Sequence, residues 1–315
     1  MKEVVLTKPP YMNPSELRIA DMHTVLNVLN VLIGELSLLE PGDPDLVARL
    51  RQLDSELDRI ARQVKEGGPV AALLPRIRKS EEPVMTLLDD LLADETALTG
   101  REQIKETAGN LESVFSIVKQ RLHELEMRTD EPDVWVLISP ESFRQQFEDV
   151  LTAIARNSKG GYGIRFDLAE KAQGDYYFDL KVDAQEHDGK LWMPLRLLDV
   201  LRDLTANARK YTPPGGKVSL AITQDQKSIG AAIEDNGCGI PEDEIEKVAE
   251  FGYRAKNVRH RNTLGGGFGL TKAAWLVTSW GGSLTIRSDV DSGTTISLAV
   301  PNKELPAEPK VFGDS

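Results

Sequence analysis

The spacing of apolar residues changes after residue 159, and this change constrains the fold more than any other feature of the chain. Before it, apolar residues recur every three or four positions over 17–36, 46–64, 104–125 and 143–154, the period of amphipathic helices. After it, short alternating runs typical of strands are mixed with further helical patterns. The sequence therefore predicts an α+β fold, with an N-terminal helical part followed by a sandwich of helices on one face of a sheet.

Residues 1–68 are predicted to form a helical hairpin, because the proline- and glycine-rich run 40–44 separates two amphipathic stretches. A single hairpin cannot cover both apolar faces. Dimerisation into a four-helix bundle is one solution, and packing against later helices of the same chain is the other. Residues 69–158 are predicted to be an inserted helical region of unknown role, and residues 302–315 a loose tail.

Composition excludes several classes of function. The chain has 315 residues and a formal net charge of −12, which disfavours a nucleic-acid partner because a phosphate backbone requires a basic surface. The single cysteine, Cys238, excludes a disulfide framework and any multi-thiolate zinc site. No window reaches the roughly 18 apolar residues of a membrane span. We therefore expect a cytoplasmic protein with no membrane span.

Four short elements between residues 199 and 300 carry polar groups and glycines that suit a phosphorylated ligand with a planar base. In chain order they are Asp203–Thr212 on a helix, Glu234–Pro241 at the end of a strand, Phe251–Ala255, and Gly265–Leu270 at the start of a helix. Each element alone is a weak signal, because a glycine cluster before a helix is more often a simple turn. Their common order and spacing make the signal specific.

The side chains of the first two elements have complementary chemistry. Asp203 and Asn207 are four positions apart on one helix face, where two oxygens can hold a hydrated Mg²⁺. Lys210 on the next turn can reach a phosphate, and Tyr211 can flank a base. Asp235, at the end of a strand, offers a carboxylate to an exocyclic amine. These residues predict a base reader beside a metal anchor.

The glycines allow the backbone to approach the ligand. Gly237 and Gly239 have no Cβ to obstruct a bound base. The glycine run 265–269 leads into a helix, whose N-terminal amides and dipole suit a polyphosphate. The glycines therefore complete the predicted site with a phosphate cradle.

Residues 160–301 resemble the ATP-binding domain of the GHKL superfamily, which contains sensor histidine kinases, gyrase B, Hsp90 and MutL. The likeness is greatest to two-component sensor histidine kinases. It implies a catalytic domain over 159–301 with a Bergerat-type α/β sandwich, and ATP and Mg²⁺ as cofactors. Asn207 would coordinate the metal and Asp235 would read the adenine. The resemblance implies these nucleotide-binding residues: Asn207, Lys210, Tyr211, Asp235, Gly237, Gly239, Ile240, Tyr253, Arg254, Gly265, Gly267, Phe268, Gly269, Leu270 and Thr294.

Asp203 departs from the pattern of the histidine kinases, which usually have asparagine at this position. The ATP-hydrolysing branches of the superfamily, and its mitochondrial protein kinases, place an acid there as a general base. Asp203 is therefore either a second metal ligand, which we favour, or a catalytic base that orients water or a hydroxyl group.

The phosphoacceptor of a histidine kinase is a histidine on a helical hairpin, and His23 on the first predicted helix resembles it. Asn27 then matches the residue used in dephosphorylation of a response regulator. The acid that usually follows the phosphoacceptor is missing, because Thr24 stands there. His123 has an acid next to it but lies late in its helix, without a hairpin partner.

The sequence thus predicts a cytoplasmic histidine kinase of a two-component system. It would phosphorylate itself on His23, pass the phosphoryl group to the receiver domain of a response regulator, and dimerise through its N-terminal helices. Two alternatives stay open. In the first, the chain is an ATP-binding phosphotransfer or scaffold protein without autokinase activity. In the second, it is a GHKL ATPase or a Ser/Thr protein kinase that uses Asp203 as a base.

Overall fold

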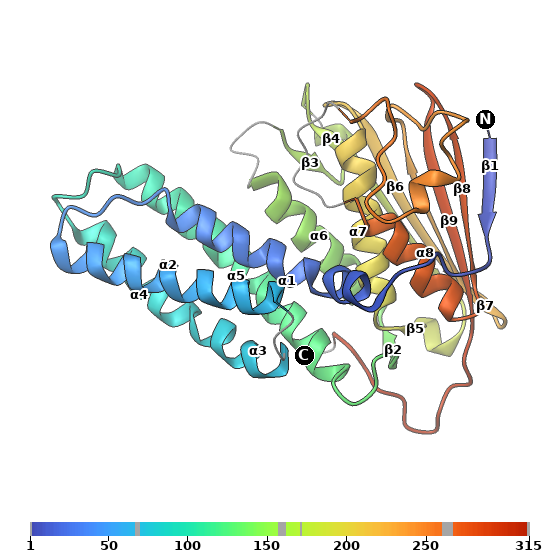
Figure 1. The fold of residues 1–315 in the computed structure, drawn as a ribbon, viewed down its shortest axis with the longest axis horizontal. Helices are drawn as coiled ribbons and strands as arrows, with labels where there is room; N and C mark the ends of the chain where they lie inside the picture. The colour runs from blue at the N-terminus through green and yellow to red at the C-terminus, as the bar shows by residue number, and fades with distance from the viewer. Residues whose placement is uncertain (1, 67–69, 157–161, 171, 260–266, 314–315) are drawn as a thin grey trace. The chain divides into compact units, whose positions relative to one another are not determined.

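The computed structural model describes residues 2–66, 70–156, 162–170, 172–259 and 267–313. It divides into two compact units (Figure 1). One consists of Arg18–Pro132, and the other combines Met1–Leu17 with Asp133–Ser315. None of the helices within the described residues is long and apolar enough to cross a bilayer.

The unit Arg18–Pro132 is built from helices around one apolar core. Its helices are α1 (Pro14–Leu36, which begins in the other unit), α2 (Pro44–Lys65), α3 (Val70–Lys79), α4 (Glu81–Ala93) and α5 (Arg101–Met127). Helix α2 begins where the sequence predicts, because the Asp43 carboxylate accepts hydrogen bonds from the amides of Asp45 at 2.7 Å and Leu46 at 3.4 Å. The sequence indicates no separate helix where α3 lies, and the helix that it predicts over 84–92 covers only part of α4.

The apolar face of α1 is covered within the chain. Leu29 and Leu32 are fully buried and belong to one core cluster with residues of α2, α4 and α5. A buried polar contact joins α1 to α5, where the Asn110 amide donates to Glu35 at 3.4 Å. Of the two predicted solutions for the hairpin, the structure therefore shows packing against later helices of the same chain.

The second unit is an α/β sandwich. Its main sheet has the order β1-β8-β9-β7-β6-β4-β3, and helices pack on one of its faces (Figure 1). The strands are β1 (Lys2–Leu6), β3 (Ile164–Arg165), β4 (Tyr176–Ala184), β6 (Lys217–Gln224), β7 (Ser228–Asp235), β8 (Ser283–Asp289) and β9 (Gly293–Pro301), and the helices are α6 (Pro140–Arg156), α7 (Leu197–Tyr211) and α8 (Gly269–Ser279). A small separate sheet pairs β2 (Trp135–Ile138) with β5 (Leu191–Pro194). The predicted α+β class is confirmed.

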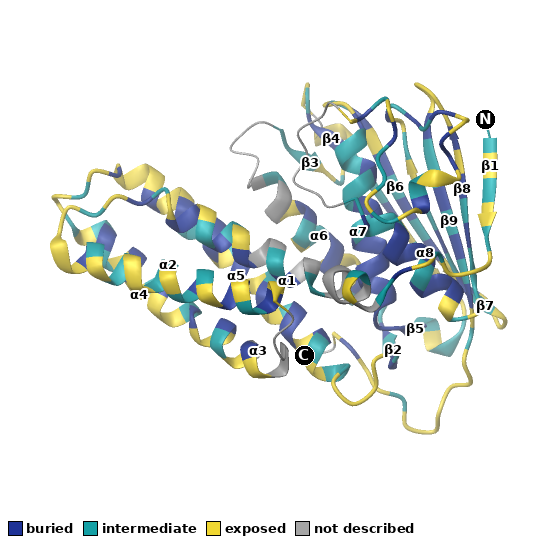
Figure 2. Cartoon of the chain, in the orientation of Figure 1, coloured by how far each residue is buried: buried dark blue, intermediate teal, exposed yellow. Residues whose placement is uncertain are grey.

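Burial explains this layering. Strands of the sheet alternate buried and less buried residues, as in β7, while α7 and α8 bury one side against the sheet (Figure 2). Leu201 and Leu204 of α7 and Ala273 of α8 are fully buried. The layer of apolar side chains between helices and sheet therefore holds the ends of α7, α8 and β7 in place.

Several predicted boundaries differ from the structure. The division falls at Asp133 rather than at 159, because β2 pairs with β5 and α6 packs on β4. The sequence predicts an extended arm over 1–12, and within it β1 adds an antiparallel edge strand to β8. The alternating pattern over 162–168 predicts a strand, but β3 comprises only two residues. The sequence also predicts a helix over 242–250, where the structure has turns and a short 3₁₀ helix at Lys247–Ala249.

The predicted loose tail 302–315 packs against the domain through its last described residues. Phe312 is 2% exposed, and its amide donates to the Leu137 carbonyl at 2.9 Å. The Leu137 amide in turn donates to the Lys310 carbonyl at 2.8 Å. An aromatic residue near the end of a polar segment therefore attaches the tail to β2.

Candidate functional site

Helices α7 and α8 bring together two of the four predicted elements. Asp203 and Asn207 lie on α7, and Gly269 is the first residue of α8. A Cβ atom added to Gly269 would lie only 3.3 Å from Asn207 Nδ2 and 3.6 Å from Asp203 Cβ. The close contact of the two helices therefore depends on glycine, and it places the Asn207 amide beside the N-terminus of α8.

Asp235, the last residue of β7, lies at the start of the second element. Its Oδ1 accepts a hydrogen bond from the Gly237 amide at 2.8 Å, and it stands opposite Thr294 of β9 in the sheet. The Thr294 hydroxyl lies 2.9 Å from that of Ser288, which also accepts from the Ile240 amide at 2.9 Å. This network fixes the acid and the turn that follows it.

Burial dominates the electrostatics of Asp235. Desolvation raises the pKa of its carboxyl to about 6, although hydrogen bonds from the amides of Gly237 and Thr294 act in the opposite direction. The buried carboxyl of Asp235 can therefore accept a hydrogen bond from a polar group of a ligand.

The C-terminal end of α7 lies against the turn after Asp235. The Cys238 amide donates to the Tyr211 carbonyl at 3.2 Å, and the Lys210 ammonium lies 5.4 Å from the centre of the Tyr211 ring. Burial, and then repulsion from Arg254 and Arg209, lowers the pKa of Lys210. Burial is the largest cause and the neighbouring positive charges add to it, so an anion at this place would relieve their repulsion.

The third element and the residues after it, up to 259, contact the second and fourth elements. The Gly252 amide donates to the Gly267 carbonyl at 3.1 Å, and the rings of Phe251 and Phe268 stack with centroids 5.6 Å apart. Asn257 donates from its side chain to the Gly239 carbonyl at 2.9 Å. The four elements therefore form one continuous site.

A buried acid organises this third element. Glu244 is 7% exposed and accepts hydrogen bonds from the Tyr253 hydroxyl at 2.9 Å and from the Lys256 amide at 2.7 Å. The Lys256 amide is the largest cause of the lowered pKa of Glu244. These two hydrogen bonds hold Glu244 in the turns over 242–250, where the predicted α-helix is absent.

The raised pKa of Asp235 predicts an unusual dependence of stability on pH. The folded carboxyl has a pKa of about 6 and the ordinary value is 3.8, so between these values the folded state keeps a proton that the unfolded state has lost. Stability from this group is therefore present below pH ~4 and is lost as the pH rises through 6, by as much as ~3 kcal/mol. Urea unfolding of the wild type and Asp235→Asn at pH 4 and 7.5 measures it. The advantage of the variant must grow with pH, and a constant difference contradicts the expectation.

Most of the predicted residues lie in this site, but their roles differ. Ile240 contributes its amide, Leu270 lies in the first turn of α8, and the ring of Phe268 is buried against Phe251. Gly265 lies outside the described residues. The helix α1 contains His23 and Asn27, but their side chains also lie outside what the structure describes. The exposed His123 is on α5.

Sequence reasoning missed four residues of the site. They are Glu244, Asn257, Lys272 and Ser288. For Lys272 a signal existed, because it is the one charged residue in the stretch Gly269–Ser279. The contacts of the other three join segments far apart in the chain, and no local pattern reveals them.

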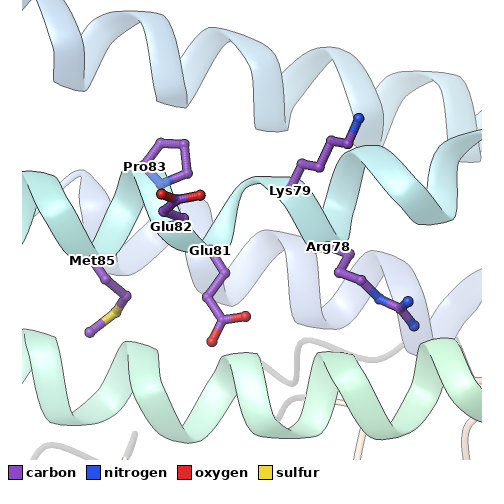
Figure 3. Close-up of a pocket in the computed structure, with 6 residues that line it drawn as sticks. All are labelled: Arg78, Lys79, Glu81, Glu82, Pro83 and Met85. Atoms are coloured by element: carbon purple, nitrogen blue, oxygen red, sulfur yellow. The ribbon is translucent and has the colours of Figure 1, made fainter.

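A surface pocket in the helical unit lies where α3 meets α4 (Figure 3). It is lined by Arg78, Lys79, Glu81, Glu82, Pro83 and Met85. Arg78 and Glu81 point toward α5, where Arg78 pairs with Glu126 at 3.0 Å and Glu81 with Lys119 at 2.7 Å. Because these charges are already paired, the pocket is a weaker candidate than the four-element site.

The oxygen atoms of the four-element site suit magnesium. Asn207 and Asp203 supply hard oxygen atoms one helical turn apart, and Mg²⁺ needs few protein ligands when phosphates and water complete its shell. Among the described residues, no group of three or more His, Cys, Asp or Glu side chains gathers to hold a metal by itself. The site therefore combines an acid for a base, a cationic region for phosphates and an oxygen pair for a metal.

Part of the chain is similar to a known family of proteins. Residues 193–304 match the family described as histidine kinase-, DNA gyrase B- and HSP90-like ATPase. This segment is a GHKL-type ATP-binding domain. It contains the site residues of α7, β7, α8 and β9 described above.

Relatives of the GHKL domain are sensor kinases. The chain is 35% identical over 111 residues to the sensor histidine kinase WalK of Bacillus subtilis, covering 35% of this chain and 18% of WalK. It is 32% identical over 174 residues to the sensor histidine kinase Hik2 of Thermosynechococcus vestitus, covering 51% of this chain and 45% of Hik2. The chain thus spans less than half the length of these curated relatives. Among solved structures, a mycobacterial sensor histidine kinase MprB matches at 23% identity with a TM-score of 0.37, covering 52% of this chain and 95% of that chain.

Proposed function

We propose that this chain is a histidine kinase of a two-component system, which phosphorylates His23 from ATP and passes the phosphoryl group to a response regulator. The observation that carries the proposal is the convergence of Asp235, Asn207 and the N-terminus of α8 in one site of a GHKL domain. Sensor histidine kinases among its relatives support this choice within the superfamily.

Each part of the site has a role in this reaction. Asp235 accepts a hydrogen bond from the adenine amine, and Tyr211 flanks the base. The cationic group formed by Lys210, Arg209 and Arg254 attracts the phosphates, whose approach relieves the mutual repulsion of these side chains. Asn207 would hold Mg²⁺ with Asp203, and the ion would neutralise charge on the β- and γ-phosphates. Catalysis then rests on positioning and charge neutralisation.

His23 is proposed as the acceptor. Its imidazole nitrogen would attack the γ-phosphorus as the bond to the ADP oxygen breaks, and the phosphoryl group would then move to an aspartate of a receiver domain. Asn27, one helical turn further along α1, would serve in dephosphorylation of that partner. A homodimer through the N-terminal helices stays a prediction, which light scattering of the purified chain checks.

Autophosphorylation tests the proposal. The wild type and His23→Gln are incubated with γ-labelled ATP, and the label is tested in acid and base. We expect an acid-labile, base-stable label on the wild type and a loss of at least ~100-fold in His23→Gln, because the nucleophile is absent. His123→Gln is the matched control and should label normally. Equal labelling of His23→Gln and wild type would contradict the assignment.

A second candidate is an ATP-binding phosphotransfer or scaffold protein without autokinase activity. Thr24 favours it, because the acid that helps to activate the imidazole is absent at that position. Bound nucleotide without any label would support this candidate. Acid-stable phosphate on a partner protein, or steady phosphate release that is lost in Asp203→Asn, would instead support a Ser/Thr kinase or an ATPase that uses Asp203 as its base.

A further inference from the structure

Lys272 is a buried lysine at the contact of α7 and α8. Its side chain is 5% exposed, and its ammonium donates a hydrogen bond to Asp203 Oδ2 at 3.0 Å. Asp203 itself is 21% exposed and therefore reaches the site surface. Burying an ammonium group is unfavourable unless an anion compensates it, so the position of Lys272 depends on Asp203.

The ion pair lies next to the proposed magnesium ligand. Lys272 follows Gly269 by three positions, which places both on one side of the first turn of α8. The Cβ position of Gly269 is 3.3 Å from Asn207 Nδ2 and 3.6 Å from Asp203 Cβ. Lys272, Asp203 and Asn207 therefore form one polar group around the N-terminus of α8.

We propose that Lys272 is a positioning residue that cancels the charge of Asp203 and holds its carboxylate in place. This inference rests on the proposed nucleotide-binding function. With Oδ2 bonded to Lys272, Oδ1 would be the oxygen offered to a metal-bound water. The pair then acts as a neutral hydrogen-bonding unit, and a polyphosphate approaches without repulsion from a bare carboxylate.

This assignment separates the two roles left open for Asp203. A general base must offer a carboxylate oxygen to a proton of water or a hydroxyl group. Here one of the two oxygens is already occupied by Lys272, and the net charge of the pair is zero. The arrangement favours a metal-side or structural role for Asp203 over catalysis of hydrolysis.

A double-mutant cycle tests the coupling through ADP binding, measured by calorimetry with Mg²⁺ and with EDTA. Lys272→Met leaves the Asp203 charge uncompensated, so affinity without Mg²⁺ should fall about tenfold and Mg²⁺ should restore most of it. Asp203→Asn removes the negative charge that faces the buried ammonium, so Mg²⁺-free affinity should rise several-fold and the melting temperature should fall. The double variant should return to within about threefold of the wild-type affinity.

Two further variants separate this role from simple packing. Lys272→Arg keeps the charge and should bind Mg²⁺-free ADP within about threefold of wild type. The exposed pair Lys105–Glu102 has the same 3.0 Å separation, and Lys105→Met combined with Glu102→Gln should leave binding unchanged. Should Lys272→Met fail to fold, Lys272→Arg and the double variant still report the charge effect.

The outcomes are distinguishable. A double variant that binds Mg²⁺-free ADP as weakly as Lys272→Met alone, or an unchanged Mg²⁺-free affinity in Lys272→Met, would overturn the inference while the proposed function stands. A loss that is the same with and without Mg²⁺ would reduce Lys272 to a packing residue and would also overturn it. A wild type that binds no ADP under either condition would remove the proposed function and this inference together.

Discussion

Replacing Asp235 with alanine lowers the affinity for ADP by about 10- to 100-fold, because a hydrogen bond to a charged group contributes about 1.5–3 kcal/mol. In the proposed function the carboxylate accepts a hydrogen bond from the adenine amine, and in the structure its Oδ1 also accepts one from the Gly237 amide at 2.8 Å. Calorimetric titration with ADP measures the loss. The selectivity for ADP over GDP should fall as well, since GDP carries a carbonyl where ADP carries the amine.

Asp225 provides a matched control for this experiment. It lies in the turn at the opposite end of β7, and its carboxylate accepts hydrogen bonds from the amides of Lys227 and Ser228, each at 2.8 Å. Asp225→Ala therefore removes a carboxylate that also supports a turn. This turn lies at the opposite end of β7 from Asp235 and the candidate site. Its ADP affinity should stay within about twofold of wild type. If Asp225→Ala and Asp235→Ala lose affinity equally, Asp235 has no special role in reading the base.

The pH dependence of binding follows from the same carboxyl. Its pKa of about 6 in the ligand-free protein means that much of Asp235 is protonated at pH 5.5. Only the ionised form accepts a full hydrogen bond from the amine, so binding should drive proton release at that pH. The proton release would be a consequence of the burial that raises the pKa of Asp235.

The site was more predictable than the fold around it. The pattern Asp235–Gly239 and the pair Asp203 and Asn207 are local in sequence, and each chemical group sits on an element whose period is clear. The structure begins α7 at Leu197 and α8 at Gly269, close to the positions that the sequence indicates. Local patterns therefore predicted segments that the structure brings together.

Non-local contacts were not predictable in the same way. Strand β2 is four apolar residues long and pairs with β5 more than fifty positions later, so neither strand shows a length or a period that reveals its partner. Strand β1 becomes part of the sheet only through β8, at the other end of the chain. The Lys272–Asp203 ion pair joins α7 to α8 in the same way. These three contacts join residues that are far apart in the chain, so no local pattern of the sequence predicts them.

Replacing Gly293 with alanine should destabilise the domain by about 3 kcal/mol or more and weaken ADP binding with it. Gly293 begins β9 with φ +92°, where a side chain is strained, and an added Cβ would lie 1.9 Å from the Asp235 carbonyl oxygen. The strand must therefore move away from Asp235 or Asp235 must move with it. Urea unfolding and ADP titration measure the two effects.

Gly281 separates the collision from the backbone strain. It has a similar φ of +78°, but no atom lies within 4 Å of an added Cβ. Gly281→Ala should therefore cost only about 1 kcal/mol and leave ADP affinity unchanged. If both variants lose the same stability, the close approach of β9 to Asp235 does not constrain the site. A larger loss in Gly293→Ala, together with weaker binding, would mean that the sheet register and the base-reading acid are held by one backbone contact.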